Sequence, residues 1–388
     1  MVSFYSVDPV NWVRLIAPAV VMIGANFVAG SASFLLVRKL RPLARPLELP
    51  LQLGIGALMS TVVPSAISQL LGITEIIHHY FVGCCAAINF FRYLEVALDT
   101  APRGVTHNLL PFLAFVSLPG AEVIFSPKDE RVVKCPPGTV VKRVVGMLLS
   151  GLGVLVSFCV LELLKGASAR DLDVSAVPLT LSDMARDLSP RQLAINYFTC
   201  CVFAGMLSIM CQLGAATFAL VLGYDSEDVM RSPMVLSQGV NDFWGRRWNR
   251  TVHRFLKRLF FTPILNATGT RWLATLAAFA ASASFHEALV HHAWSSAPPS
   301  LKPGVQGRLG YQVAFFVSQA GLCYLERLLD RLIPSLGSLA RSLPYPLQVL
   351  CTAIVISPFG PLFTAPLEAA GLLASISKLF PSIVLVAS

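Results

Sequence analysis

Long apolar runs, separated by short polar segments, make up most of the chain. A helix that crosses a bilayer needs roughly 20 mostly apolar residues. Runs that meet this requirement lie near residues 15–37, 51–73, 76–98, 144–164, 193–223, 272–292, 309–329 and 345–371. The pattern therefore predicts an all-α, polytopic protein with about eight transmembrane helices. Two shorter apolar stretches, 108–125 and 372–388, are expected to be interfacial or re-entrant.

Proline-containing breakers divide the runs at 41–46, 135–138 and 297–300. Because the connecting segments are short, we expect one membrane-embedded domain over residues 1–388. The sequence contains no internal repeat of the kind that builds transporters from two related halves.

Composition agrees with a lipid environment. Hydrophobic residues make up 55% of the 388 positions and charged residues only 13%, where a soluble domain has roughly 25% charged residues. The mean hydropathy is +0.67. A soluble globular domain is excluded because too few charged residues are present to cover its surface.

The basic residues gather in short clusters between apolar runs. A net charge of +9 could favour nucleic acid, but clusters at 38–45, 128–143 and 246–258 are more typical of cytosolic loops. This arrangement predicts a lumenal N-terminus and a lumenal acidic loop at 171–187. The orientation depends on the third run, which contains four ionisable residues; if that run does not cross the membrane, half of the topology is inverted.

Neither export processing nor disulfide chemistry is indicated. The first 14 residues lack the basic start and cleavage site of a signal peptide, so we expect the first apolar run to remain in the protein. The nine cysteines include no CxxC pair and are expected to be small core residues.

The segment from Asn241 to Phe260 combines two of the five tryptophans with a cluster of arginines. At helical spacing, five apolar residues share one face: Trp244, Trp248, Val252, Phe255 and Leu259. Basic residues share the other: Arg247, Arg250, Arg254 and Lys257 or Arg258. The pattern predicts an amphipathic interfacial helix. Its basic face suits either anionic lipid headgroups or the phosphates of coenzyme A, and periodicity does not separate the two.

His286 stands inside the apolar run near 272–292, among small residues that permit a lined cavity. An ionisable residue within a span costs roughly 2.5–3.5 kcal/mol when charged, which makes it a functional candidate by default. The alternative is a neutral histidine that shares a hydrogen bond with a neighbouring helix. A neutral imidazole is also the form that a general base requires.

Metal binding is disfavoured by the histidine spacing. His286 and Glu287 are followed by His291 and His292, which gives H-E-x-x-x-H-H where zinc proteases have H-E-x-x-H. The chain has only seven histidines, fewer than a membrane di-iron desaturase with several histidine boxes would need.

Two motifs resemble those of a known family. The sequence Asp242-Phe243-Trp244-Gly245-Arg246-Arg247-Trp248-Asn249, preceded by Ser232-Pro233, is similar to the signature of the wax synthase branch of the membrane-bound O-acyltransferases. The sequence Ser282-Ala283-Ser284-Phe285-His286-Glu287 is similar to the family's Ser-Gly-x-x-His-Glu motif, with Ala283 where glycine is usual. The resemblance covers about residues 230–292.

This resemblance implies transfer of an acyl group from acyl-CoA to a lipophilic alcohol, which could be a fatty alcohol, sterol, diacylglycerol or secondary metabolite. His286 would be the general base and Asn249 would orient a reactant or donate to the oxyanion, with no covalent acyl-enzyme. The implied acyl-CoA site is Trp244, Arg246, Arg247 and Trp248, supported by Asp242, Phe243 and Glu287. No metal or redox cofactor and no nucleic acid are expected, and the predicted location is the endoplasmic reticulum membrane.

A transporter or channel is the competing hypothesis. An intramembrane histidine and basic residues also mark permeation paths. That hypothesis leaves the Trp-Arg-Asn signature unexplained.

Overall fold

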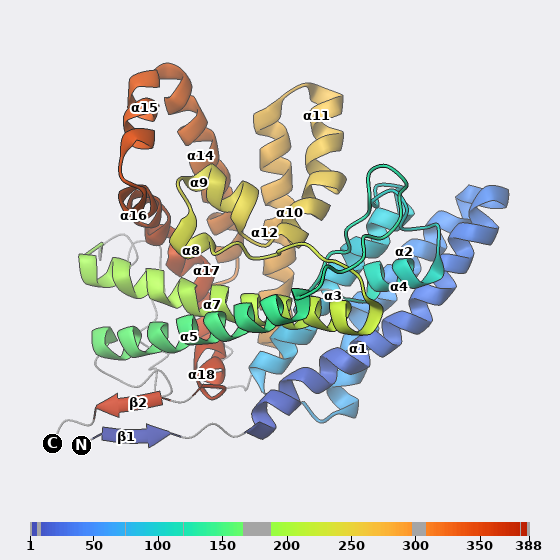
Figure 1. The fold of residues 1–388 in the computed structure, drawn as a ribbon, viewed down its shortest axis with the longest axis horizontal. Helices are drawn as coiled ribbons and strands as arrows, with labels where there is room; N and C mark the ends of the chain where they lie inside the picture. The colour runs from blue at the N-terminus through green and yellow to red at the C-terminus, as the bar shows by residue number, and fades with distance from the viewer. Residues whose placement is uncertain are drawn as a thin grey trace.

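The chain folds almost entirely into helices, as seen in a computed structural model that describes residues 2–5, 9–73, 75–118, 120–165, 188–296, 308–380 and 382–385 (Figure 1). The helical segments, in chain order, are α1 (Pro9–Leu35), η1 (Leu36–Leu40), α2 (Arg41–Leu70), α3 (Ile76–Ala97), α4 (Leu109–Ser117), α5 (Thr139–Lys165), α7 (Pro190–Thr217), η3 (Phe218–Leu222), α8 (Pro233–Leu236), α9 (Val240–Asp242), η4 (Phe243–Arg247), α10 (Arg250–Leu256), η5 (Lys257–Phe261), α11 (Thr262–Thr268), α12 (Arg271–Ser296), α14 (Tyr311–Leu332), α15 (Pro334–Ser342), α16 (Tyr345–Ile356), η6 (Ser357–Phe359), α17 (Gly360–Ala369) and α18 (Leu372–Ser377). The acidic 171–187 loop and the 297–300 breaker lie outside the described residues.

Two short strands near the chain ends modify the predicted all-α architecture. β1 (Val2–Tyr5) pairs antiparallel with β2 (Ser382–Leu385), and Val2 lies opposite Leu385. The pairing brings the two termini together (Figure 1). Both strands are rich in β-branched and aromatic residues, which favour extended backbone. The 372–388 stretch, expected as one interfacial piece, therefore divides into α18 and β2.

Five helical stretches of the described chain are long and apolar enough to cross a bilayer: Trp12–Leu70, Thr139–Lys165, Pro190–Leu222, Arg271–His292 and Tyr345–Ala369. The protein is thus a multi-pass membrane protein, but the count differs from the eight spans predicted. The third and seventh runs do form helices, α3 and α14. Neither is among the five, and both contain charged or polar residues that lower their hydropathy, such as Arg92 and His78 in α3 and Glu326 in α14.

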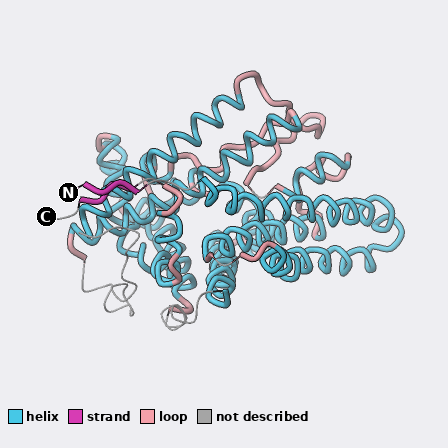
Figure 2. The backbone as a smooth tube through the Cα atoms, turned by 90° about the horizontal axis from the view of Figure 1, so that it is seen from below, coloured by secondary structure: helices cyan, strands magenta, loops and turns pink. Residues whose placement is uncertain are grey.

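The 59-residue stretch Trp12–Leu70 contains the first two predicted runs. Its backbone leaves helical geometry at Ala44, with φ −151° and ψ 71°. Figure 2 shows the two halves as a hairpin whose turn forms the right-hand end of the molecule. The halves are joined where Ser33 Oγ donates to Gln52 Oε1 at 2.5 Å. Two antiparallel helices are therefore packed against each other here.

Close helix packing defines the rest of the framework. α5 and α7 run side by side (Figure 1), and at Gly205 an added Cβ would overlap the side chain of Val154. A small residue is needed at such a close approach. α12 and α14 pack against each other. In the view of Figure 1 they extend upward beyond the α5–α7 pair. α4, formed by the 108–125 stretch, is too short to cross and is buried from Pro111 to Ser117.

Candidate active site

His286 is held in one orientation in the middle of α12. Its Nδ1 lies 2.8 Å from the carbonyl oxygen of Ser282, one turn earlier. Because a carbonyl oxygen only accepts hydrogen bonds, Nδ1 carries the hydrogen and Nε2 is left as the acceptor nitrogen. The imidazole packs against Phe316 of α14 and Phe363 of α17, with ring centroids 4.5 and 5.6 Å away.

A cavity of about 520 Å³ opens onto this histidine. It is lined by five residues that the sequence had singled out: Trp244, Arg246, Trp248, Asn249 and His286. The other four do not line it: Asp242, Phe243, Arg247 and Glu287. The fold thus brings the tryptophan-arginine signature and the intramembrane histidine, about 40 residues apart in sequence, to one space.

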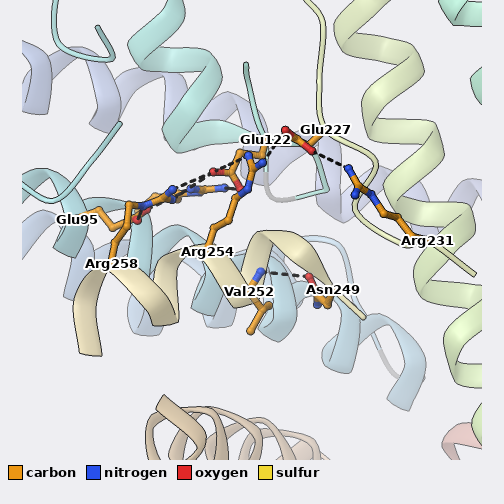
Figure 3. Close-up of polar contacts among 9 residues, drawn as sticks. Glu95, Glu122, Glu227, Arg231, Asn249, Val252, Arg254 and Arg258 are labelled. Atoms are coloured by element: carbon orange, nitrogen blue, oxygen red, sulfur yellow. Dashed lines mark hydrogen bonds and ion pairs between the residues drawn. The ribbon is translucent and has the colours of Figure 1, made fainter. Parts of the chain in front are cut away.

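The predicted continuous amphipathic helix over the signature segment is wrong. η4 ends at Arg247 and α10 begins at Arg250, and between them Asn249 adopts a left-handed conformation with φ 31° and ψ 70°. Asparagine tolerates this region better than most residues. Asn249 Oδ1 accepts a hydrogen bond from the Val252 backbone N–H at 3.2 Å and so caps α10 (Figure 3).

Residues outside the cavity hold the signature in shape. Asp242 accepts a hydrogen bond from Arg247 Nε at 2.6 Å, and Phe243 stacks on Trp248 with ring centroids 5.3 Å apart. Arg247, predicted to contact coenzyme A, is therefore engaged by Asp242. Its contact with coenzyme A stays a prediction.

α14 supplies positioning contacts that the sequence did not reveal, since it predicted only a span there. Gln319 Oε1 accepts from Trp244 Nε1 at 3.1 Å. Glu326 accepts from the backbone N–H of Asn241 at 2.7 Å. At Gly239 an added Cβ would overlap the Glu326 carboxylate, so a residue without a side chain is required for this approach.

Glu287 has a comparable connecting role. Its Oε1 accepts a hydrogen bond from the Gly310 backbone N–H at 2.7 Å. The bond ties α12 to the residue that precedes α14. Glu287 thereby couples the helix of His286 to the helix that provides Phe316.

Positive charge lines the cavity from several elements. The cationic side chains come from η4, η5, α12 and α14: Arg246, Lys257, Arg271 and Arg327. Three of these basic residues, all but Arg246, were not singled out as site residues from the sequence. His253 also lines the cavity, but burial and the nearby Arg250 and Lys257 lower the pKa of its imidazole to about 4. It is therefore neutral near pH 7.

Two residues of the basic face predicted from periodicity do not line the cavity. Arg254 and Arg258 point away from the cavity and pair with Glu95, Glu122 and Glu227 (Figure 3). These carboxylates come from distant parts of the chain, so sequence spacing could not identify them.

A second, apolar chamber of about 50 Å³ adjoins the first. The two share Trp244, Trp248 and Phe316 in their linings. The remaining walls of the chamber come from α7, α8, α14, α16, η6 and α17, and from Phe243 of η4, one of the residues that the sequence had singled out. A cation-lined space and an apolar space thus lie on two sides of the same aromatic residues.

Residues 92–296, over half of the chain, match the MBOAT, membrane-bound O-acyltransferase family. The chain belongs to this family. The matched region contains both the signature segment and His286. Membership accounts for the signature that the transporter hypothesis left unexplained.

Curated relatives of this membrane-bound O-acyltransferase include two kinds of enzyme. A probable long-chain-alcohol O-fatty-acyltransferase 1 from Arabidopsis thaliana is 26% identical over 51% of this chain and 53% of its own length. Diacylglycerol O-acyltransferase 1 from Chlorocebus aethiops is 44% identical over 14% of this chain and 11% of its own. The human protein of that name is 43% identical over the same shares. The chain spans at most about half the length of these relatives.

Proposed function

We propose that the protein transfers an acyl group from acyl-CoA to the hydroxyl of a lipophilic alcohol, with His286 as general base. One observation carries the proposal: an imidazole with an acceptor Nε2 opens onto a cation-lined cavity that adjoins an apolar chamber. Such a site suits one phosphate-bearing and one apolar reactant. The implied location in the endoplasmic reticulum stays a prediction.

The chemistry needs one proton acceptor and no covalent enzyme intermediate. His286 Nε2 takes the hydroxyl proton as the alcohol oxygen attacks the thioester carbonyl carbon. The carbon–sulfur bond then breaks, and the imidazolium returns its proton to the coenzyme A thiolate. The Nδ1–H donated to Ser282 keeps the ring oriented through both proton transfers.

Asn249 can stabilise the negative charge that develops on the carbonyl oxygen. Its Oδ1 is already used in capping α10, so its amide Nδ2 is the group that remains to donate. An oxyanion requires a donor held in place before the reaction. The cap fixes the Asn249 side chain on the cavity wall.

The proposed substrates are distinguished by class. Phosphate groups of the acyl-CoA would pair with the cavity cations, and the aromatic walls that the cavity shares with the apolar chamber would contact the lipophilic part of a substrate. Long-chain-alcohol and diacylglycerol acyltransferases occur among the relatives. Fatty alcohols, sterols, diacylglycerols and secondary metabolites are all candidate acceptors.

A single assay tests the function. Membranes that contain the protein are incubated with labelled acyl-CoA and a panel of these alcohols, and the labelled esters are identified. We expect one acceptor class to yield ester. If no ester forms with any alcohol, although the protein is inserted and folded, the proposed activity is ruled out.

Replacing both Arg246 and Arg271 with glutamine is expected to raise the KM for acyl-CoA at least tenfold and to leave the alcohol KM nearly unchanged. Both line the cavity, and Arg246 is 79% exposed and lies 3.7 Å from Asp242, a distance that leaves its guanidinium able to contact a phosphate as well. A hydrogen bond to a charged group contributes about 1.5–3 kcal/mol, and a tenfold change corresponds to about 1.4 kcal/mol.

The matched control for this double variant is Arg331→Gln/Arg341→Gln. Both residues are exposed on the α14–α15 arm and do not line the cavity. Steady-state kinetics in detergent or nanodiscs provide the KM values. An unchanged acyl-CoA KM in the folded Arg246/Arg271 variant would remove the phosphate-binding role from this pair.

A further inference from the structure

The continuous helix formed by α10 and η5 has two faces with different partners. One face lines the cavity through Val252, Leu256 and Lys257. The other carries Arg254 and Arg258, four residues apart and therefore on one side of the helix (Figure 3).

Both arginines of the second face are bound by carboxylates. Arg254 Nη2 lies 2.5 Å from Glu227 Oε1, and Arg254 Nη1 lies 3.6 Å from Glu122 Oε1. Arg258 pairs with Glu95 through Nε and with Glu122 at 3.2 Å. Arg254 and Arg258 are each neutralised inside the protein, whereas Arg250, one turn earlier, donates to the Arg246 carbonyl oxygen at 3.2 Å.

The three carboxylates are delivered by separate elements. Glu95 lies on α3, Glu122 follows α4, and Glu227 follows η3. A bridge between Val123 and Ser226 brings the last two together, with the Glu227 N–H donating to the Glu122 carbonyl at 3.0 Å.

Burial makes these carboxylates depend on the helix. The side chains of Glu95 and Glu122 are 0% and 1% exposed. Neighbouring buried carboxylates repel each other unless cations lie between them. The arginines of the helix, together with Arg92 of α3, supply those cations. The helix is therefore held at a fixed rotation.

Rotation determines which cation enters the cavity. Successive residues of a helix are turned by about 100°, so a shift of one position would replace Lys257 by Arg258 in the lining. Within the described residues, Lys257, Arg271 and Arg327 make no ion pair and all three line the cavity. On this helix, Arg254 and Arg258 have carboxylate partners and are turned away from the cavity, and Lys257 faces it.

We infer that Glu95, Glu122 and Glu227 are positioning residues for acyl-CoA binding: by holding Arg254 and Arg258, they keep Lys257 and the capping Asn249 on the cavity wall. The inference rests on the proposed function. It concerns residues that touch no substrate and act through α10 and η5.

The test is Glu122→Gln in the full-length protein, purified in nanodiscs. We expect the Kd for coenzyme A to rise at least fivefold and the acyl-CoA KM to rise by a similar factor. kcat should stay within about twofold, because His286 lies on another helix. In the double variant Glu122→Gln/Arg254→Gln the two increases in Kd should be less than additive, since Glu122 and Arg254 share one ion pair.

Glu48→Gln is the matched control. Glu48 is equally buried and also pairs with two arginines, Arg41 and Arg45 of the α1–α2 hairpin. Its loss should lower stability without changing the Kd for coenzyme A. An equal rise in Kd in this control would attribute the effect to general destabilisation and overturn the inference.

Glu227→Gln replaces Glu122→Gln if the latter does not fold. Glu227 is 19% exposed, so replacing its carboxylate with a neutral amide is expected to reduce stability less. It contacts α10 through Arg254. An unchanged Kd in whichever variant folds would overturn the positioning role. Failure of the wild-type protein to bind coenzyme A would instead remove the proposed function itself.

Discussion

Replacing His286 with alanine is expected to lower ester formation by about 10²–10⁴-fold while the protein remains expressed and inserted. The imidazole is the only proton acceptor proposed for the alcohol hydroxyl. Its orientation depends on the Nδ1–H donated to Ser282, which no smaller side chain reproduces. Phe316 and Phe363 surround the ring and are expected to preserve the local packing.

Initial rates with saturating acyl-CoA measure this effect, and the KM for acyl-CoA should change little. Ser284→Ala is the matched control, because Ser284 lies on the same helix, is exposed and donates to the Ala280 carbonyl one turn earlier. It should keep nearly full activity. A His286→Ala variant within a few fold of wild type would exclude the general-base role.

Replacing Arg92 with methionine is expected to destabilise the protein by roughly 3–5 kcal/mol, the range for breaking a buried ion pair. The Arg92 side chain is 1% exposed and pairs with Glu95 at 3.1 Å and Glu122 at 3.5 Å. Its guanidinium also lies 4.4 Å from the Phe115 ring centroid. Without it, two buried carboxylates lose a shared cation.

Unfolding by denaturant in a mixed-micelle assay reports this free energy. Arg341→Met breaks the exposed pair with Asp330 and should change stability by less than about 1 kcal/mol. If both variants unfold alike, the buried cluster around Arg92 contributes no more than a surface pair.

Much of the membrane architecture could be predicted because it depends on local composition. The apolar runs near 144–164 and 193–223 became the long helices α5 and α7. The breaker predicted at 135–138 precedes α5, which begins at Thr139, and the one at 41–46 contains the departure from helical geometry at Ala44. The number of spans was not, because charged residues of α3 and α14 are compensated by contacts with other segments, as in the pairs Arg92–Glu122 and Glu95–Arg258.

The candidate site, too, was predictable where it depends on adjacent residues and unpredictable where it depends on backbone conformation. The signature residues and His286 could be identified from adjacent residues in the sequence, and the structure brings Trp244, Arg246 and His286 to one cavity. The break at Asn249 was missed because periodicity continues through a left-handed residue without any change in the hydrophobic pattern.

By itself, the sequence determined that this protein lies in lipid, forms long helices and carries a membrane-bound O-acyltransferase signature. Only the tertiary structure decided which cations face the cavity. Arg254 and Lys257 are both basic and three residues apart, but Glu122 and Glu227 bind one and leave the other facing the cavity. Charge pairing depends on distance in space, and the partners that select between these side chains come from segments over 20 residues away in the sequence.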